Sequence, residues 1–352
     1  MKALEIVIAA AAALLTFTAC RPDTPDTPQQ TGLKGMLVLN NGNWGSNDAS
    51  VSLFDPDSGE VTGNLFLTVN NMHLGDLGQD IMAAGDDIYI AVNGSQLVFV
   101  TDRDLRVKAV VEAYADGAKL SPRHFAAGGG KVYVTYYEGL LGEIDPKTYK
   151  VRTTAVGPNP DGVAYAGGRL YVANSGGYLP TFNNTVSVVD AASFTEIATM
   201  EVSVNPACVV ASGNGRYVYV SSLGNYADVP PMLQVIDVRG GSVSGTDYGR
   251  VAGIAMGAGD ELIVASGGYD ENWNIAATLW RHDAGSNTKI GKLTEMPVSP
   301  FYSISADPSS GDVFVGTSDY VTDGDVHRFD AAGKYHGKFD ALGMNPQKVI
   351  RL

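Results

Sequence analysis

The chain has few of the residues that mark a disulfide scaffold or a familiar catalytic centre. Its 352 residues include two cysteines, Cys20 and Cys208, and five histidines without a His-x-His pair. Two cysteines are too few for a disulfide framework or a cysteine metal cluster. The sequence also has no G-x-S-x-G motif, so the nucleophile elbow of many hydrolases is excluded. Cys208 lies in the strand-like segment "PACVVAS", where we expect a small core residue and not a nucleophile.

Basic residues are also scarce. Lys and Arg number 24 against 38 Asp and Glu, which gives a formal net charge of −14. A chain this acidic repels polyphosphates and anionic membrane surfaces. We therefore expect no nucleic-acid partner.

Long apolar runs are absent except near the N-terminus, where one short run follows Lys2 and covers residues 6–15. It is too short to span a bilayer stably but suits the core of a signal peptide. The segment ends on "LTFTAC", which resembles the lipobox of bacterial lipoproteins. The resemblance implies cleavage before Cys20 and a diacylglyceryl thioether on its sulfur. An ordinary secretory signal with an incidental cysteine is the alternative.

These features predict three parts of the chain. Residues 1–19 are expected to be the signal peptide, and residues 20–33 the lipidated cysteine followed by a flexible tether. The tether contains "RPDTPDTPQQTG", which is too polar and too rich in proline to pack. No linker or shift in composition divides residues 34–352, so we expect one large domain there.

One pattern of short strands recurs in this domain about every 45 residues, a spacing typical of propeller repeats. An apolar segment such as "GQDIMAAG" or "PACVVASG" comes first, and a strand such as "DIYIAVN" or "YVYVSS" follows a short turn. A third strand ends on aspartate, and a fourth, more polar strand completes the unit. Seven units predict an all-β fold, a seven-bladed β-propeller of four-stranded antiparallel blades. The C-terminal "NPQKVIRL" is expected to join the blade of "MLVLNN" near the N-terminus and so to close the ring.

The recurring aspartates could suggest catalysis, but their position favours a structural role. An aspartate at such a turn accepts hydrogen bonds from backbone N–H groups two residues on. Because the residue recurs in every unit, we expect it to stabilise turns. The seven are Asp55, Asp102, Asp145, Asp190, Asp237, Asp283 and Asp330.

The loops predicted on one rim of the propeller are long and rich in aromatic residues. In a four-stranded meander, the loop between the second and third strands lies on the same rim as the connection into the next blade. Tyr and Trp offer stacking area at low side-chain entropy cost. We expect some of these rings to pack against loops and the rest to form a shallow basin for a large, partly apolar ligand. The predicted ligand-binding residues are Trp44, Tyr137, Tyr178, Phe182, Tyr226, Tyr269, Trp273 and Tyr320 from the loops, with His73, Arg123, Phe301 and Tyr302 from the blade connections.

An enzymatic role has little support in the sequence. His73 and His124 lie on or near the aromatic rim, but two histidines without a thiolate make a weak metal site. Asp76, Asp80 and Asp161 are expected near the channel mouth, where acids could hold a cation as in lactonase-type propellers. We expect no catalytic residue, metal or cofactor, and keep a hydrolase or lactonase as an alternative.

The rhythm "YVAN" followed by "NTVSVVD" resembles the YVTN/YncE-like family of bacterial seven-bladed propellers. The first unit, "LNNGNWGSNDASVSLFDPDSGEV" with "LGDLGQDI" after it, resembles a subgroup of Bacteroidetes surface lipoproteins that includes BtuG-type cobalamin-binding proteins. This resemblance implies an outer-membrane protein, anchored by its lipid and exposed at the cell surface. It also implies capture of cobalamin (vitamin B12) or a related corrinoid and transfer to a BtuB-like TonB-dependent outer-membrane transporter. A protein-interaction scaffold in the cell envelope is the alternative from a different class.

Overall fold

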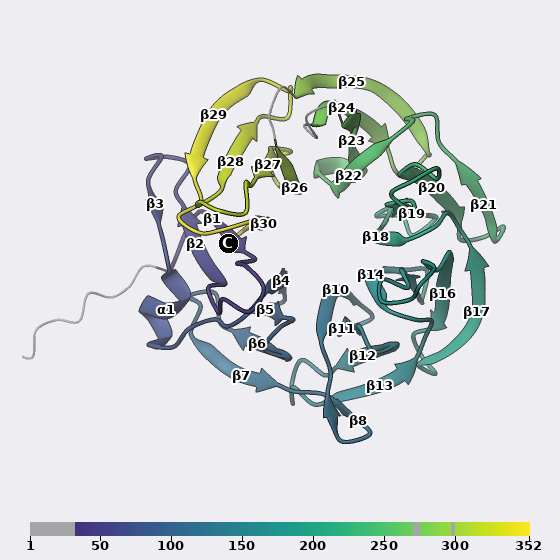
Figure 1. Cartoon of the computed structure of the whole chain (residues 1–352), viewed down its shortest axis with the longest axis horizontal. Coiled ribbons are helices and arrows are strands. Elements are labelled where there is room, and N and C mark those ends of the chain that lie inside the picture. Colours follow the sequence, from purple (N-terminus) through teal and green to yellow (C-terminus); the bar gives the residue numbers. More distant parts are fainter. Residues whose placement is uncertain (1–31, 270–274, 297–299) are drawn as a thin grey trace, which may run out of the picture. The chain divides into compact units, whose positions relative to one another are not determined.

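Seven four-stranded antiparallel sheets surround a central channel, as Figure 1 shows. The computed structural model describes residues 32–269, 275–296 and 300–352. Leu33–Leu352 form one compact unit. The all-β, seven-bladed propeller predicted from the repeats is confirmed.

Six blades each use four consecutive strands, which run from the channel outward in chain order. Blade 2 has β4 (Gly78–Ala84), β5 (Asp87–Val92), β6 (Leu97–Thr101) and β7 (Val107–Val111), and blade 3 has β10 (Pro122–Gly128), β11 (Lys131–Tyr136), β12 (Leu140–Ile144) and β13 (Val151–Ala155). Blade 4 has β14 (Pro160–Ala166), β15 (Arg169–Asn174), β16 (Thr185–Asp190) and β17 (Thr195–Glu201), and blade 5 has β18 (Pro206–Ala211), β19 (Tyr217–Ser222), β20 (Met232–Asp237) and β21 (Ser242–Gly245). Blade 6 has β22 (Val251–Met256), β23 (Glu261–Tyr269), β24 (Ile275–Asp283) and β25 (Thr288–Met296), and blade 7 has β26 (Phe301–Ala306), β27 (Val313–Thr317), β28 (Asp325–Phe329) and β29 (Tyr335–Asp340).

Blade 1 joins the two ends of the described chain. Its strands are β30 (Pro346–Arg351), β1 (Met36–Asn40), β2 (Ser50–Phe54) and β3 (Val61–Thr62), in that order from the channel. β30 is antiparallel to β1, with Val38 opposite Val349. The expected closure of the ring by the C-terminal strand is therefore confirmed.

The burial of the strands follows their place in a blade. The second strands are β-branched and aromatic, and β5 is buried along its whole length because neighbouring blades cover both of its faces. The outermost strands are polar, and β17 is almost entirely exposed. The core therefore consists of layers between adjacent blades, such as the cluster that joins Tyr89 of blade 2 to Phe125 and Val134 of blade 3.

Blade 1 departs from the expected pattern in its outermost strand. The repeat predicts a fourth strand here as in the other units, but pairing is limited to Val61–Thr62, and α1 (Leu65–Asn70) follows. Leu65 and Phe66 are buried, and Phe66 packs against Phe99 of blade 2 at 4.9 Å between ring centroids. Burial of these two side chains against the next blade thus outweighs further strand pairing. A small two-stranded ribbon, β8 (Tyr114–Ala115) with β9 (Ala118–Lys119), is a second addition to the repeat, and a single turn of 3-10 helix, η1 (Ala258–Asp260), is a third.

The recurring aspartates form turns, as expected. Each of the seven accepts a hydrogen bond from a backbone N–H two or three residues on, at 2.8 to 3.0 Å. Their repetition is therefore explained by turn geometry.

Among the described residues, no helix has the length and hydropathy that crossing a bilayer requires.

Candidate functional site

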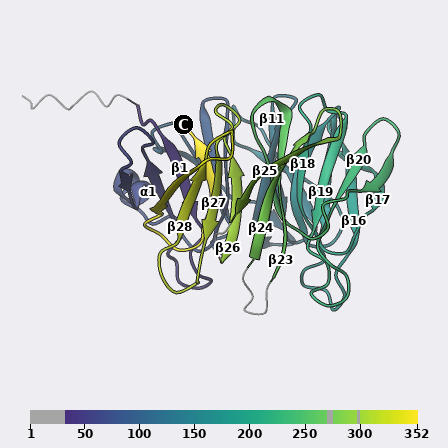
Figure 2. The same cartoon turned by 90° about the horizontal axis from the view of Figure 1, so that it is seen from above.

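The two rims of the ring carry different loops, and the order of the strands along the chain determines which loops lie on which rim. One rim, here called the loop-rich rim, carries the loops between second and third strands and the connections between blades. The other, the short-turn rim, carries the remaining turns and the C-terminus. Figure 2 shows the longer loops projecting from one side and the C-terminus on the other. The N-terminal end of the described chain also lies on the short-turn rim, where the Leu33 N–H donates to Asp104 Oδ1 at 3.0 Å in the turn between β6 and β7.

Four of the predicted aromatic residues are strongly exposed on the loop-rich rim. Trp44 is 83% exposed, Tyr178 82%, Tyr226 75% and Tyr320 62%. They come from the loops of blades 1, 4, 5 and 7. An aromatic ring offers a large flat surface for stacking, so these four side chains place stacking area at separate points of the loop-rich rim.

Two further loop aromatics, Tyr137 and Phe182, are half-buried and pack against these rings. Tyr137 meets Tyr178 edge to face at 4.6 Å between centroids, which links the loops of blades 3 and 4. Phe182 of blade 4 meets Tyr226 of blade 5 in the same way at 5.7 Å. The expectation that some rim aromatics pack against neighbouring loops is met by these contacts.

The remaining predicted residues separate into three groups. Arg123, Phe301 and Tyr302 line the channel, and Tyr302 meets Tyr320 edge to face at 5.8 Å. His73 is exposed but borders a small cleft beside α1 at the outside of blade 1, away from the channel-lining residues. The backbone of Tyr269 ends β23, its side chain lies outside the description, and Trp273 lies outside the described residues.

The channel has a volume of about 840 Å³ and is lined by the seven innermost strands. Each of these strands has a β-bulge near the loop-rich rim, seen as a register shift against the second strand of its blade. A bulge redirects side chains, and here two consecutive residues of every strand line the channel. These pairs are Gln79–Asp80, Arg123–His124, Asp161–Gly162, Ala207–Cys208, Ala252–Gly253, Tyr302–Ser303 and Gln347–Lys348.

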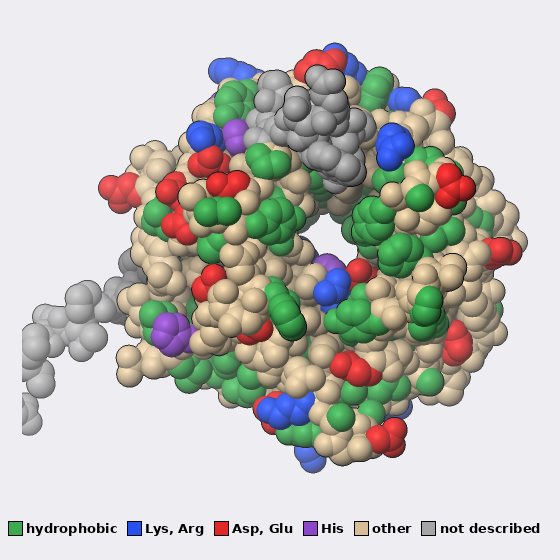
Figure 3. Space-filling model, in the orientation of Figure 1, with side chains coloured by type: hydrophobic (Ala, Val, Ile, Leu, Met, Phe, Trp, Pro, Cys, Tyr) green, Lys and Arg blue, Asp and Glu red, His purple; other side chains and the backbone are tan. Residues whose placement is uncertain are grey.

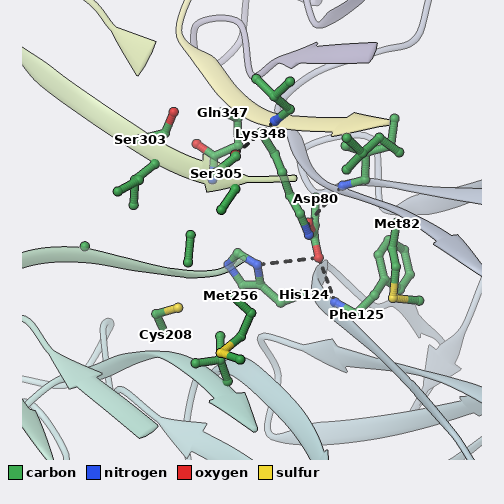
Figure 4. Close-up of a pocket in the computed structure, with 18 of the residues that line it drawn as sticks. Asp80, Met82, His124, Phe125, Cys208, Met256, Ser303, Ser305, Gln347 and Lys348 are labelled. Carbon is green, nitrogen blue, oxygen red and sulfur yellow. Dashed lines mark hydrogen bonds and ion pairs between the residues drawn. The ribbon is translucent and has the colours of Figure 1, made fainter. Parts of the chain in front are cut away.

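Charged members of these pairs form one network across blades 1 to 4. The Lys348 ammonium donates to Asp80 Oδ1 at 2.7 Å. His124 lies between the two acids, with Nδ1 3.7 Å from Asp80 Oδ2 and Nε2 3.2 Å from Asp161 Oδ1. Arg123 donates to Asp161 at 3.0 Å and to Gln79 at 2.9 Å. Figure 4 shows Asp80 between Lys348 and His124, with a further bond from the Phe125 N–H.

The electrostatics of the network keep its members charged. Burial alone would raise the pKa of Asp80, but Lys348 and His124 hold this pKa well below its usual value. Burial would likewise raise the pKa of Asp161, but Arg123 and His124 lower it to about 2. Burial opposes a charge on His124, but the hydrogen bonds to Asp161 and Asp80 raise the pKa of the imidazole to about 9. The network thus holds two carboxylates and three cations at neutral pH.

The acids that could have held a cation are therefore already engaged. Asp80 and Asp161 are paired with basic side chains, and Asp76 accepts the Gly45 N–H at 3.0 Å. Across the part of the chain that the structure describes, no group of three or more His, Cys, Asp or Glu side chains has the arrangement of a metal site. The interaction of a positive side chain with each buried acid is the physical alternative to a bound metal.

Cys208 is partly buried against the core cluster of blades 5 and 6, in line with its expected place in the core, and it also lines the channel. It is a free thiol of intermediate exposure. Burial raises the pKa of this thiol to about 12, so it stays protonated at neutral pH, and a protonated thiol is a poor nucleophile.

Reasoning from sequence named Arg123 for the site but did not place Gln79, His124 or Lys348 in a binding role. The signal was present, because every innermost strand has an apolar residue just after its bulge, which we call its apolar anchor. Gln79 lies two residues before the anchor Ile81, and His124 and Lys348 lie directly before the anchors Phe125 and Val349. Aligning the seven units at the bulge would have exposed the charged positions.

Solved structures of other proteins share this propeller fold. Hydrazine synthase from Kuenenia stuttgartiensis is similar in fold, with a TM-score of 0.57 and 16% identity over 72% of this chain and 76% of that one. A structure of U3-55K is also similar, with a TM-score of 0.55 and 11% identity over 77% of this chain and 88% of the other. At such identities the likeness concerns the fold alone. No curated protein sequence matches the chain significantly. A family model does match residues 34–334, so the chain belongs to the family described as "Domain of unknown function (DUF5074)".

Proposed function

We propose that this protein is a lipid-anchored surface protein that captures a large, partly apolar ligand at the loop-rich mouth of its channel. The ligand class is cobalamin or a related corrinoid, which the protein hands to a BtuB-like TonB-dependent outer-membrane transporter. The observation that carries the proposal is the set of exposed aromatic side chains that four different blades present on one rim. Such rings stack on the planar and apolar parts of a ligand.

The channel below these rings supports the same function. Arg123 stacks on Tyr137, with 4.9 Å from the guanidinium carbon to the ring centroid, and joins the rim to the charged network. A corrinoid is large, apolar in part and fringed with amides, so it would use both stacking and hydrogen-bonding groups. The chain enters the ring at Leu33 on the short-turn rim, so an upstream lipid anchor would join the ring on the rim opposite the proposed ligand face.

The second candidate function is a protein-interaction scaffold. It is favoured by the position of Trp44, Tyr178, Tyr226 and Tyr320, which are exposed on the rim and are not among the channel-lining residues. Exposed aromatic residues of this kind commonly anchor protein partners. The two candidates differ in whether a small molecule binds without any partner protein.

Isothermal titration of the mature chain with cyanocobalamin tests the choice. We expect binding at micromolar concentration or tighter. Replacing both Trp44 and Tyr320 by alanine should weaken it by about tenfold or more, since each stacking contact contributes about 0.5–1.5 kcal/mol. The Ile290→Ala variant is the control, because Ile290 is 53% exposed but lies on the outermost strand β25.

Absence of heat with the wild-type chain would overturn corrinoid capture. If an envelope protein then copurified with the wild-type chain and was lost in the double variant, the scaffold function would stand in its place. Retained corrinoid binding in the double variant would leave the function intact and move the site away from Trp44 and Tyr320.

A further inference from the structure

The channel has two chemically different walls at its loop-rich end. The residue directly before the apolar anchor of each innermost strand occupies one layer of the channel. Blades 1, 2 and 3 place Lys348, Asp80 and His124 in this layer, whereas blades 4 to 7 place small residues there. These are Gly162, Cys208, Gly253 and Ser303.

At this layer blades 4 to 7 therefore present little side-chain bulk, and at Gly162 a Cβ would lie 2.5 Å from the backbone oxygen of Ala207 in β18. Above them, toward the loop-rich rim, blades 5 to 7 add Ala207, Ala252, Phe301 and Tyr302. Gly253 cannot become larger without cost, because a Cβ there would lie 2.9 Å from Ile304 and 3.1 Å from Phe301. Figure 3 shows hydrophobic side chains around much of the opening, with basic and histidine side chains gathered on one part of its wall.

The charged side of the channel presents cations to the open space. The side chain of Lys348 is 36% exposed, that of His124 28% and that of Arg123 21%. Their carboxylate partners are deeper, with the side chain of Asp161 12% exposed and that of Asp80 3%. We call Arg123, His124 and Lys348 the cationic wall. It stands out in a chain of net charge −14.

Lys348 also has hydrogen-bonding capacity to spare. An ammonium group has three N–H donors, and within the described residues the Lys348 ammonium makes one hydrogen bond, to Asp80. The two carboxylates of the network balance two of its three cations. A ligand that enters the channel therefore meets one unbalanced positive charge and free donors at its charged side.

We propose that the cationic wall is a subsite for an anionic oxygen group, a phosphate ester or a carboxylate, of a ligand whose apolar body rests against the small-residue side of the channel. The proposal rests on the ligand-capture function and narrows it, since it requires the ligand to be amphipathic and to carry an anion. A charge-assisted bond to Lys348 inside a partly enclosed channel is stronger than one in open solvent.

The test compares probes with and without the anion. Cyanocobalamin contains a phosphodiester, dicyanocobinamide lacks it, and phenyl phosphate joins a flat apolar ring to a phosphate. Binding of each is measured by isothermal titration at low salt and at high salt, because salt screens the charge contribution. Benzoate in place of phenyl phosphate distinguishes a carboxylate from a phosphate ester as the preferred anion.

The decisive variant is Lys348→Gln, with Lys348→Arg as the rescue that keeps the charge. Lys338→Gln is the matched control, since Lys338 is 55% exposed on the outer strand β29 and pairs with Asp325. We expect Lys348→Gln to weaken the binding of cyanocobalamin and phenyl phosphate by about tenfold or more, because it removes a charge-assisted hydrogen bond to the anion. Dicyanocobinamide should be unaffected, and the Arg and Lys338 variants should bind as the wild type does.

Each outcome decides one of the two claims. If a folded Lys348→Gln variant binds all phosphate-bearing probes like the wild type, the subsite is wrong although corrinoid capture stands. If the wild type binds no corrinoid but binds phenyl phosphate through Lys348, capture of corrinoids is wrong and the subsite stands. Binding of no anionic probe overturns the subsite. Should Lys348→Gln fail to fold, the double variant Asp80→Asn with Lys348→Gln removes both charges and is judged by the same criteria.

Discussion

At the scale of single residues, the acids beside the channel mouth show how context sets the role of a side chain. Asp80 and Asp161 could have been metal ligands by type and position. The structure instead places each against basic side chains from a neighbouring blade. A buried carboxylate with two such partners stays ionised, which ties blades together through charge.

His124 gives this network a measurable pH dependence. Its pKa in the folded chain is raised to about 9, above the ordinary value of 6.5. The stability that its charge contributes is therefore complete below about pH 6.5 and is lost as the pH rises through about 9. We expect the melting temperature of the wild type to fall between pH 7 and pH 9.5, and that of His124→Gln to fall less.

The other ionisable groups around His124 would not make the melting temperatures of the wild type and of His124→Gln differ between pH 7 and pH 9.5. The pKa values of Asp80 and Asp161 are lowered, away from this pH range, and burial raises the pKa of the Cys208 thiol to about 12. Arg123 donates to Asp161 in both proteins. Lys348 contacts Asp80 on its far side and is present in both proteins. Thermal unfolding followed by circular dichroism across this range gives the comparison. Parallel pH profiles for the two proteins would show that His124 is not charged in the folded state.

At the scale of elements, β30 holds the ring closed. It supplies the innermost strand of blade 1, and Lys348 and Arg351 on it pair with Asp80 of blade 2 and Asp307 of blade 7. Removing residues 346–352 would expose the edge of β1 and leave two buried carboxylates without these cations.

We expect this truncation to abolish a single cooperative thermal transition. Circular dichroism and gel filtration provide the measurement, with aggregation or loss of a sharp transition as the expected result. Removing the same number of residues from the Pro/Thr/Asp stretch within residues 21–31 is the control and should leave the transition unchanged. A truncated chain that melts like the wild type would mean that the propeller is stable as an open ring.

The β-bulges are the second feature at this scale. They occur near the loop-rich rim in all seven innermost strands. Because a bulge turns successive side chains toward the same space, each blade has two consecutive residues at the bulge among those that line the channel.

At the scale of the whole molecule, the proposed function depends on how the protein is held. The lipobox resemblance predicts a lipid on Cys20, and the ring begins on the short-turn rim. We expect the wild-type chain, expressed in a bacterium that processes lipoproteins, to enter the detergent phase on Triton X-114 partitioning. Cys20→Ser should move it to the aqueous phase, because the lipid supplies the apolar anchor.

Cys208→Ser is the matched control, because Cys208 lies on the channel wall and should not affect partitioning. Detergent partitioning of Cys20→Ser equal to that of the wild type would contradict lipidation. Metabolic labelling with a fatty acid gives an independent readout, with label expected on the wild type and on Cys208→Ser alone.

The sequence by itself determined the number of blades, the order of strands and the closing strand. These depend on local periodicity: apolar alternation, Gly-rich turns and a turn aspartate repeat in every unit, and each acts within a few residues. The same reasoning predicted which loops lie on which rim, because alternate connections of a meander lie on the same side. It failed at Leu65 and Phe66, because their burial against blade 2 decided in favour of a helix.

Only the tertiary structure decided the chemistry of the channel. Lys348 and Asp80 are 268 residues apart in the chain, yet their side chains form a 2.7 Å hydrogen bond across blades 1 and 2. A local pattern does not show which side chains of different blades meet, because that depends on how the folded blades pack around the channel. The sequence thus placed the aromatic residues on a common rim, whereas the ring brought the acids and bases of four blades together into one network.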